Sequence, residues 1–383
     1  MKNLWEDAKA LECKSDLALR VYSSNLLGQS DELVLHGGGN TSVKSLVDGE
    51  EILFVKGSGW DLVSIKEEGF APVKMATLLQ MARLSSLSDT DMVSGQKEAM
   101  IDKSAPNPSV EAILHALIPF KVVDHTHADA IVTISNSKQG QEHIKSLYPN
   151  FLIIPYVMPG FILAQKIYEM TQDNFDWNAC EGLILHNHGI FTFDDDAKVS
   201  YTKMIEAVSL AEDFLEENAP IILDNIRPKY FNIEDLSLDK FRHINQSPLA
   251  VHYASQEDLR AKVTRGVLTP EHIIRTKRIP LVIEDWDIED AVRHYRVDYE
   301  TYFSAYANDE IMLDSNAKYA VIKNFGIITF GKTQKEADVI NDVVSHTMMA
   351  VLRADKLGGY KSICIADSFA MEYWELEQAK LGK

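Results

Sequence analysis

The sequence predicts an α/β fold of the α+β kind, in which helices cover the faces of a mixed sheet. Segments with strand and helix patterns alternate along the first half of the chain, an order typical of sheets covered by helices. The segment L-I-L-H-N-H-G-I-F-T-F at 183–193 also returns as A-V-I-K-N-F-G-I-I-T-F at 320–330. This repeat predicts a degenerate second copy in the C-terminal half. The alternative is an unrelated domain that ends in a similar strand and helix.

The first half supplies the elements in order. Runs with helical periodicity lie at 4–27, 71–86, 109–118 and 196–217. Strand patterns lie at 33–44, 51–60, 122–127 and 183–193. The first strand turns on three glycines and the second ends in a glycine-rich turn, whereas the polar stretch 87–108 has the composition of a loop. Ser109 is placed to cap the helix that follows it.

The length of 383 residues predicts two domains. Residues 218–260 mix apolar residues with Asp, Asn and Pro, so we place the boundary there and assign residues 1–235 and 236–383 to the two domains. Pro270 suits the first turn of a helix over 269–277. A weaker match, V-K-G-S-G at 55–59 with T-R-G-V-L at 264–268, extends the repeat. Because the interval that follows has no H-x-H and no P-S-x-E, we expect that the ligand-bearing segment has no counterpart.

The composition excludes several classes of protein. The net charge is −19, and phosphate backbones need a basic face, so we expect no nucleic acid partner. The N-terminus is acidic and the longest apolar stretch contains prolines, so we expect neither a signal peptide nor a membrane span. The three cysteines are far apart, which argues against disulfides and thiolate metal sites. We therefore predict a cytoplasmic protein.

Two histidines, His125 and His127, are one residue apart in a predicted strand. Alternate residues of a strand point to the same side, so both imidazoles can hold one ion. A catalytic zinc site needs three protein ligands and an open position. The segment H-N-H-G at 186–189 supplies the third ligand, either His186 or His188. The alternative is that these histidines belong to the core.

Polar neighbours extend this candidate site. Asp124 and Asp129 are placed either to orient the imidazoles or to serve as solvated or capping carboxylates. The turns H-G-G-G-N-T-S and K-G-S-G expose backbone N–H groups that suit phosphate oxygens, with Lys56 adding charge; alternatively they are only tight turns. Glu111 starts a helix and could simply interact with its dipole. His115, one turn later, either contacts Glu111 or packs.

These motifs together resemble the class II aldolase/adducin family, whose enzymes are zinc-dependent aldolases and epimerases of sugar phosphates. The segments that carry the resemblance are G-G-G-N-T-S, K-G-S-G, P-S-V-E, H-T-H-A-D and N-H-G. Within this family, the sequence most resembles the aldolase half of the bifunctional rhamnulose-1-phosphate aldolase/alcohol dehydrogenases. The segments that carry this closer resemblance include V-K-G-S-G-W-D-L, Y-V-M-P-G-F and E-Y-W-E-L-E-Q-A-K-L. The sequence ends at Lys383, so we expect the dehydrogenase half to be absent.

The resemblance implies roles for individual residues. It assigns one Zn²⁺ per chain to His125, His127 and His188, and it assigns proton transfer to Glu111. It places the phosphate end of the substrate on a larger polar set, Asn40, Thr41, Gly57, Ser58 and Ser109. Several phosphate-binding relatives read P-S-S-E where this chain has Val110, so one hydroxyl is missing.

The implied reaction is retro-aldol cleavage of a ketose 1-phosphate to dihydroxyacetone phosphate and an aldehyde, lactaldehyde if the substrate is rhamnulose 1-phosphate. Zinc would act as a Lewis acid in this reaction. Two alternatives stay open: a related epimerase, dehydratase or aldolase of a non-phosphorylated acid, and an adducin-like interaction module without catalysis. Because family aldolases are commonly four-fold tetramers, we expect a homo-oligomer, either a dimer or a tetramer. The second half would act as a scaffold, with Arg275, Lys277 or Arg278 facing the anionic substrate.

Overall fold

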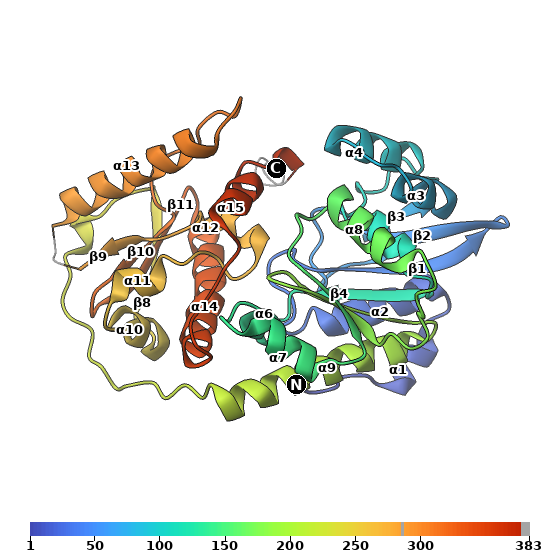
Figure 1. The fold of residues 1–383 in the computed structure, drawn as a ribbon, viewed down its shortest axis with the longest axis horizontal. Helices are drawn as coiled ribbons and strands as arrows, with labels where there is room; N and C mark the ends of the chain where they lie inside the picture. The colour runs from blue at the N-terminus through green and yellow to red at the C-terminus, as the bar shows by residue number, and fades with distance from the viewer. Residues whose placement is uncertain (285–286, 377–383) are drawn as a thin grey trace. The chain divides into compact units, whose positions relative to one another are not determined.

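The structure, a computed structural model, describes residues 1–284 and 287–376, which fall into two compact units (Figure 1). The first unit comprises Met1–Ile131 and Gln141–Asp213, and the second comprises Val132–Gly140 and the chain from Phe214 onward. The end of the C-terminal motif noted above, 377–381, lies outside the described residues. Within the described part of the chain, no helix is long and apolar enough to cross a membrane.

The first unit is built on a seven-stranded sheet in the order β3-β2-β1-β4-β7-β6-β5. Its strands are β1 (Asn40–Val47), β2 (Glu50–Lys56), β3 (Phe70–Lys74), β4 (Val122–Thr126), β5 (Phe151–Ile154), β6 (Gly182–Leu185) and β7 (Gly189–Asp194). All neighbours are antiparallel except β5 and β6. The mixed sheet agrees with the predicted fold class. All five residues of the central strand β4 are buried, so side chains at its end are held in a rigid, dry environment.

Helices connect and cover these strands. They are α1 (Asp7–Glu12), α2 (Asp16–Leu27), α3 (Met75–Ala82), α4 (Asp89–Glu98), α5 (Ala112–Leu117), α6 (Asp129–Ser135), α7 (Gly140–Leu147), α8 (Phe161–Thr171) and α9 (Ala197–Asn218), with a 3-10 turn at Glu67–Gly69. Helix α2 contacts β1, and α5 contacts α3 and α8. The long helix expected over 196–217 is confirmed as α9.

Several predicted elements have different bounds. The helix expected over 4–27 is interrupted before α2, where Ser15 accepts a hydrogen bond from the backbone N–H of Ala18 at 3.0 Å. The first part of the strand expected over 33–44 is a series of turns, because His36, Gly37 and Gly39 have positive φ. The first residues of the helix expected over 71–86 instead form β3, which places Pro72 on an edge strand, where proline is tolerated.

The loop expected over 87–108 contains helix α4. Ser88 caps this helix by accepting from the N–H of Asp91 at 3.1 Å. Only Met92 and Gln96 of its ten residues are buried, so the sequence has no apolar stripe to reveal it. The next helix, α5, begins at Ala112 and not at Ser109, since Glu111 occupies its N-cap position.

The strand expected over 183–193 is a hairpin, in which β6 and β7 run antiparallel. The chain reverses at Asn187, whose φ of 59° is in the left-handed region. His186 and His188 therefore flank a tight turn and do not alternate along one strand, which changes how they approach the other histidines.

The second unit has a four-stranded sheet in the order β8-β11-β10-β9. Its elements are η2 (Ile233–Asp235), β8 (Phe241–Asn245), α10 (Pro248–Ala254), α11 (Leu259–Val263), η3 (Pro270–His272), α12 (Ile273–Thr276), β9 (Leu281–Ile283), α13 (Ile288–Tyr306), β10 (Tyr319–Ile322), β11 (Gly326–Gly331), α14 (Gln334–Lys356) and α15 (Ile365–Glu372). Pro270 opens a helical turn, as predicted. Val321 and Ile327 face a core with α10 and α14, whereas Ile322 and Ile328 face one with α13.

The hairpin β10–β11 repeats the hairpin β6–β7 at an offset of 137 residues. Thr192 pairs with Gly182 in the first hairpin, and Thr329 pairs with Tyr319 in the second. The Thr192 hydroxyl donates to the Ser200 carbonyl at 3.0 Å, and the Thr329 hydroxyl donates to the Ala337 carbonyl at 2.7 Å. Because each partner lies eight residues downstream, at the start of the following helix, the predicted second copy is confirmed.

The second copy also retains a counterpart of β4, the strand that carries His125, contrary to our expectation. β7 pairs His125 with Phe191, and β11 pairs Ile244 with Ile328 at the matching position. Strand β8 is therefore the counterpart of β4, with Ile244 in place of His125. Residues 264–268 are not the counterpart of 55–59, because they follow helix α11 and do not end a strand. The pairing of β8 with β11 thus matches that of β4 with β7, but Ile244 cannot bind a metal as His125 can.

Candidate active site

Three histidines of the first unit converge at the end of β4. His125 is the next-to-last residue of that strand, His127 follows the strand, and His188 lies in the turn between β6 and β7. Their nearest ligand atoms all lie within 4.8 Å of one another. The Nε2 atoms of His125 and His127 are 3.0 Å apart. The three histidines chosen from the sequence are thus brought together by two separate segments.

The surroundings of His125 prepare its Nε2 atom to bind an ion. Its Nδ1 atom lies 3.0 Å from the carbonyl oxygen of Ile190, so Nδ1 carries the hydrogen and Nε2 presents its lone pair. The ring stacks on Phe191 with centroids 4.0 Å apart. Burial, followed by the neighbouring His127 and His188, lowers the pKa of His125 well below its ordinary value. A neutral imidazole held in one tautomer is the form that binds metals.

Glycines allow the rings to come this close. A Cβ on Gly189 would lie 2.3 Å from the Thr126 carbonyl oxygen and close to both ring systems, at 3.1 Å from His125 and 3.2 Å from His127. A Cβ on Gly38 would lie 3.3 Å from Nδ1 of His127. The glycine of N-H-G and one glycine of H-G-G-G therefore leave room for the imidazoles.

The donor set fits a divalent ion such as zinc. Zinc–nitrogen bonds of about 2.0–2.1 Å with tetrahedral angles place neighbouring nitrogens roughly 3.3 Å apart. The 3.0 Å between Nε2 of His125 and Nε2 of His127 is close to that spacing. Three imidazoles also leave one coordination position for substrate, as catalytic zinc sites require.

Glu111 directs its carboxylate at the same point. Its Oε2 lies 3.5 Å from Nε2 of His125, and its Oε1 lies 3.7 Å from Nε2 of His188. The residue is 4% exposed. Asn40 donates to Oε2 at 2.6 Å. A carboxylate in this position can exchange a proton with a molecule that binds beside the histidines.

The glycine turn K-G-S-G and the segment P-S-V-E lie side by side. Gly57 forms an isolated bridge with Pro108, and the N–H of Ser58 donates to Asn107 at 2.9 Å. The N–H of Ser109 donates to the carbonyl of Lys56 at 3.1 Å. Three predicted phosphate-binding residues, Gly57, Ser58 and Ser109, are therefore neighbours. Asn40 joins them, because its Nδ2 lies 3.1 Å from the Ser109 hydroxyl.

Thr41 is placed apart from this group. Its side chain is fully buried and its hydroxyl lies 2.8 Å from that of Ser24. Successive residues of a strand point to opposite faces, so Thr41 faces away from the side of β1 that carries Asn40. Lys56, expected to add charge for a phosphate, is also buried and donates to the carbonyl of Gly37 at 3.0 Å.

Asp124 has neither of the roles considered from the sequence. It is fully buried, forms an ion pair with Arg20 at 2.6 Å, and accepts from the Ser200 hydroxyl at 2.5 Å. His125 is instead oriented by a backbone carbonyl. His186 is buried, and burial lowers the pKa of its imidazole. The metal-ligand group found among the described residues contains His188 and not His186, which agrees with the preference taken from the resemblance.

Two of the three cations expected to face the substrate, Lys277 and Arg278, contact aromatic rings of the second unit. Nζ of Lys277 lies 3.5 Å from the centre of the Tyr299 ring, and Arg278 lies over the Tyr302 ring. Lys277 is only 5% exposed. Contrary to our expectation, it does not present a free charge to a substrate.

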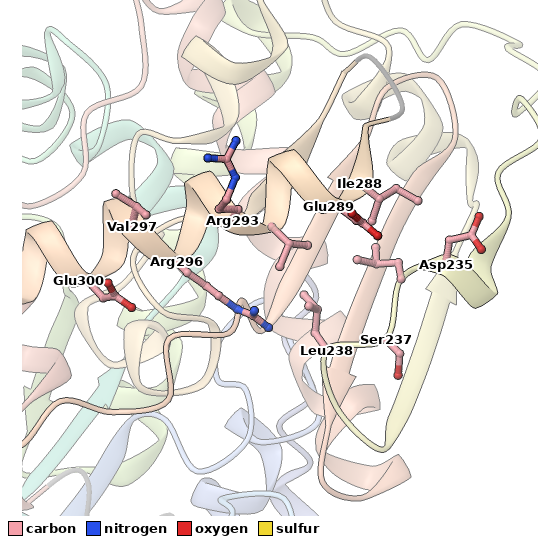
Figure 2. Close-up of a pocket in the computed structure, with 11 residues that line it drawn as sticks. Asp235, Ser237, Leu238, Ile288, Glu289, Arg293, Arg296, Val297 and Glu300 are labelled. Atoms are coloured by element: carbon pink, nitrogen blue, oxygen red, sulfur yellow. The ribbon is translucent and has the colours of Figure 1, made fainter.

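A groove of about 560 Å³ also lies in the second unit (Figure 2), between the segment 235–238 and helix α13. Its lining contains neither histidine nor cysteine. Two arginines line it, but Arg296 bonds to Asn316 and Arg293 pairs with Asp290. The groups suited to catalysis are those of the first unit.

Residues 20–215 match the family model described as Class II Aldolase and Adducin N-terminal domain. The chain belongs to the class II aldolase and adducin family. Residues 218–381 match a further model, Aldolase class II, second domain, in agreement with the duplication seen in the strands. The fold class and the family expected from the sequence are thereby confirmed.

Individual proteins are similar to this chain to different degrees. The N-terminal class II aldolase domain of a conserved protein from Thermoplasma acidophilum is 38% identical, covers 56% of this chain and 99% of its own, and superposes with a TM-score of 0.51. L-fuculose-1-phosphate aldolase from Thermus thermophilus is more distant, at 14% identity, 52% and 95% coverage and a TM-score of 0.35. The Bacillus subtilis protein named uncharacterized oxidoreductase YuxG is 28% identical over the whole chain, which spans 60% of that protein's length.

Proposed function

We propose that this member of the class II aldolase family cleaves a ketose 1-phosphate, of the rhamnulose 1-phosphate kind, into dihydroxyacetone phosphate and an aldehyde. One observation carries the proposal: the Glu111 carboxylate lies 3.5 Å from His125 and 3.7 Å from His188 in a buried position. A candidate proton-transfer group thus stands beside a set of candidate metal ligands.

We infer that His125, His127 and His188 hold one Zn²⁺ per chain. A divalent ion there supplies Lewis-acid stabilisation of the negative charge that develops on substrate oxygens when the C3–C4 bond breaks. In the cleavage the electron pair of the C3–C4 bond passes to the C3 side, the C4 hydroxyl loses its proton to a separate base, and C4 becomes the aldehyde carbon. Glu111 would deliver a proton to C3 of the dihydroxyacetone phosphate half, and it would remove that proton in the direction of synthesis. The surrounding apolar residues, Phe191 among them, exclude water from this step.

The phosphate end of the substrate is proposed to bind where the K-G-S-G turn meets the P-S-V-E segment. Gly57, Ser58 and Ser109 offer backbone N–H groups and hydroxyls there, and successive N–H groups of this kind suit phosphate oxygens. Val110 replaces a hydroxyl that several relatives carry. For that reason an epimerase, a dehydratase or an aldolase of a non-phosphorylated acid is the second candidate, because each can use the same histidines and the same carboxylate.

A panel of substrates tests the proposal. Purified protein, first stripped with a chelator and then reloaded with zinc, is given a series of ketose 1-phosphates, and dihydroxyacetone phosphate is detected with a coupled enzyme. We expect zinc-dependent release from at least one ketose 1-phosphate. An isomer of unchanged mass would indicate an epimerase, loss of water would indicate a dehydratase, and no zinc uptake would return the adducin-like alternative.

We also propose that the chain is a homo-oligomer, either a dimer or a tetramer, and that its partner is a small sugar phosphate. The resemblance to four-fold aldolases supports the assembly, and the second copy in each chain could fill a second position in such a ring.

A further inference from the structure

A buried chain of polar groups stands behind Glu111. Ser42 and Asn40 are alternate residues of β1, so they share one face of the strand. His115 lies one helical turn after Glu111, on α5. Ser42 and His115 are 0% exposed, and Asn40 is 7% exposed. Buried polar groups almost always have hydrogen-bond partners. The donor and the acceptor of each hydrogen bond among these residues can therefore be assigned.

Close polar contacts join these residues in a line. The Ser42 hydroxyl lies 2.8 Å from Nδ1 of His115. Nε2 of His115 contacts Oδ1 of Asn40. Nδ2 of Asn40 lies 2.6 Å from Oε2 of Glu111 and 3.1 Å from the hydroxyl of Ser109. The line therefore runs from Ser42 through His115 and Asn40 to Glu111.

The direction of every hydrogen bond follows from the carboxylate end. Asn40 donates through its NH₂ group to Oε2 of Glu111 and to the Ser109 hydroxyl, so the nitrogen end of the amide faces these two groups. The Asn40 carbonyl oxygen then faces His115, so Nε2 of His115 must donate. Burial lowers the pKa of His115 to about 3, so the ring is neutral and has one N–H. Nδ1 is therefore an acceptor, and Ser42 donates to it.

We propose that Ser42 and His115 are positioning residues, which hold the Asn40 amide in one orientation so that Glu111 is bound through Oε2 and its Oε1 is left to face the substrate. This proposal rests on the proposed function in one respect, the proton transfer by Glu111. Both N–H groups of the Asn40 amide are used, one on Ser109 and one on Oε2. The remaining oxygen, Oε1, is the one that lies 3.7 Å from His188.

The orientation of Asn40 depends on His115 because the oxygen and the NH₂ group of an amide have similar sizes. Only the hydrogen-bond partners decide which of the two faces Glu111. With the N–H of His115 in place, turning the amide over would bring Nδ2 against that N–H, donor against donor. Without the N–H, nothing on that side opposes the turn, and Oδ1 can face Glu111. His115 also meets the edge of Phe191, with centroids 5.5 Å apart, so a packing role has to be separated from a positioning role.

The imidazole tautomer gives a test that is independent of catalysis. Protein labelled with ¹⁵N in histidine is measured by NMR near neutral pH, and the His115 resonances are assigned through their loss in His115→Gln. We expect the Nε2–H form with Nδ1 as an acceptor. Ser42→Ala removes the donor to Nδ1, and the Nε2–H form should persist in this variant because the Asn40 carbonyl still accepts from Nε2. A wild-type ring in the Nδ1–H form would reverse the line of hydrogen bonds and overturn the proposal.

Kinetics of the zinc-loaded protein test the consequence for Glu111. His115→Leu keeps the bulk of the ring and removes both nitrogens, and we expect kcat to fall on the order of 10²-fold, the scale of a small misplacement of a catalytic group. KM and zinc content should not change. His115→Gln, whose amide can donate to Asn40, should recover most of the loss. Ser23→Ala, which removes another fully buried hydroxyl outside the line, is the matched control.

Two kinetic results would overturn the proposal. One is a His115→Leu variant with wild-type kcat, and the other is a rise in KM with kcat unchanged, which would mean that Asn40 acts in ground-state binding. The two proposals can fail separately. A wild type that cleaves no ketose 1-phosphate overturns the proposed function, whereas the tautomer of His115 in that same protein still decides the direction of the hydrogen bonds.

Discussion

Gly189 lies directly against the carbonyl oxygen of Thr126, so that a Cβ on this glycine would stand 2.3 Å from that oxygen. The same relationship recurs in the second copy, where a Cβ on Gly326 would stand 2.4 Å from the carbonyl oxygen of Asn245. Thr126 and Asn245 are matching positions on β4 and β8, since they pair with Ile190 and Ile327 at the offset of 137 residues. The close approach of hairpin and strand thus belongs to the fold, and only the first copy surrounds it with histidines.

Substitution of these two glycines distinguishes an effect on the stability of the fold from an effect on zinc binding. We expect Gly189→Ala and Gly326→Ala each to lower the free energy of unfolding, by roughly 1–3 kcal/mol for overpacking alone. The cost at Gly326 should be the larger, because its φ of 133° is one that alanine rarely adopts. Only Gly189→Ala should also weaken zinc binding, because its Cβ presses on the His125 and His127 rings. Urea unfolding and zinc titration of both variants measure this, and equal zinc affinity in the two would show that the glycine does not position the ligands.

The second copy also suggests how to remove a ligand with little disturbance. His188→Phe introduces the residue that the matching position, Phe325, carries in the same hairpin. We expect the zinc content to fall from one ion per chain to almost none, with activity lost. Replacing Phe325 by Leu is the control and should leave the zinc content at one. Elemental analysis decides the outcome, and two ions per chain in the wild type would mean that the second copy binds metal after all.

His127→Ala tests the same assignment from β4. Its loss removes one of three ligands, and we expect both zinc retention and turnover to fall. Full metal content together with full activity in this variant would show that the site has been misassigned.

Glu111→Gln keeps the shape of the side chain and its contact with Asn40 but removes the proton-transfer group. We expect zinc content to be preserved while turnover falls by roughly 10²–10⁴, the usual contribution of general acid–base catalysis. Exchange of the C3 proton of dihydroxyacetone phosphate with solvent, followed by NMR, isolates this step. Undiminished exchange in the variant would remove Glu111 from the mechanism.

The chemistry of the site was more predictable than the local folding around it. His125 and His127 could be chosen because they alternate in a segment with a strand pattern, whereas the choice of His188 and the role of Glu111 came from the resemblance. The helix α4 could not be predicted, since only Met92 and Gln96 face inward and periodicity needs a longer stripe. The turn at Asn187 could not be predicted because apolar residues lie on both sides of it, and this pattern predicts one continuous strand.

Contacts between residues far apart in the chain could not be predicted from the sequence. Arg20 and Asp124 form a fully buried ion pair although 104 positions separate them in the chain. The local sequence around either residue does not predict which residue it pairs with. The link between His115 and Glu111 was considered from their spacing on a helix. It runs instead through Asn40, which β1 contributes, so pairing of β1 with β4 had to be known first.

The proposed assembly can be checked directly. We expect light scattering of the purified protein to give two or four times the chain mass of 43.1 kDa at micromolar concentration. Our reason is the resemblance to four-fold aldolases, whose sites lie near subunit contacts. A fully active monomer at that concentration would show that one chain completes the site alone.

Lys44 makes the stability of the protein depend on pH in a defined direction. The side chain is buried and donates to the carbonyl oxygens of Ile118 and Phe120. Burial lowers the pKa of Lys44 from its ordinary 10.5 to about 7. Between these values the unfolded chain binds a proton that the folded chain does not, so stability rises with pH across this window and is lost as pH falls toward 7.

Comparison with Lys44→Met isolates this effect, because the other titrating groups are common to both proteins. From about pH 7 to about pH 10, the free energy of unfolding of the wild type should rise relative to that of Lys44→Met by up to roughly 4–5 kcal/mol, an upper bound set by the size of the pKa shift. Urea unfolding across this range measures the difference. A difference that stays constant with pH would mean that Lys44 keeps its charge in the folded protein, with the two carbonyl oxygens compensating for the loss of water.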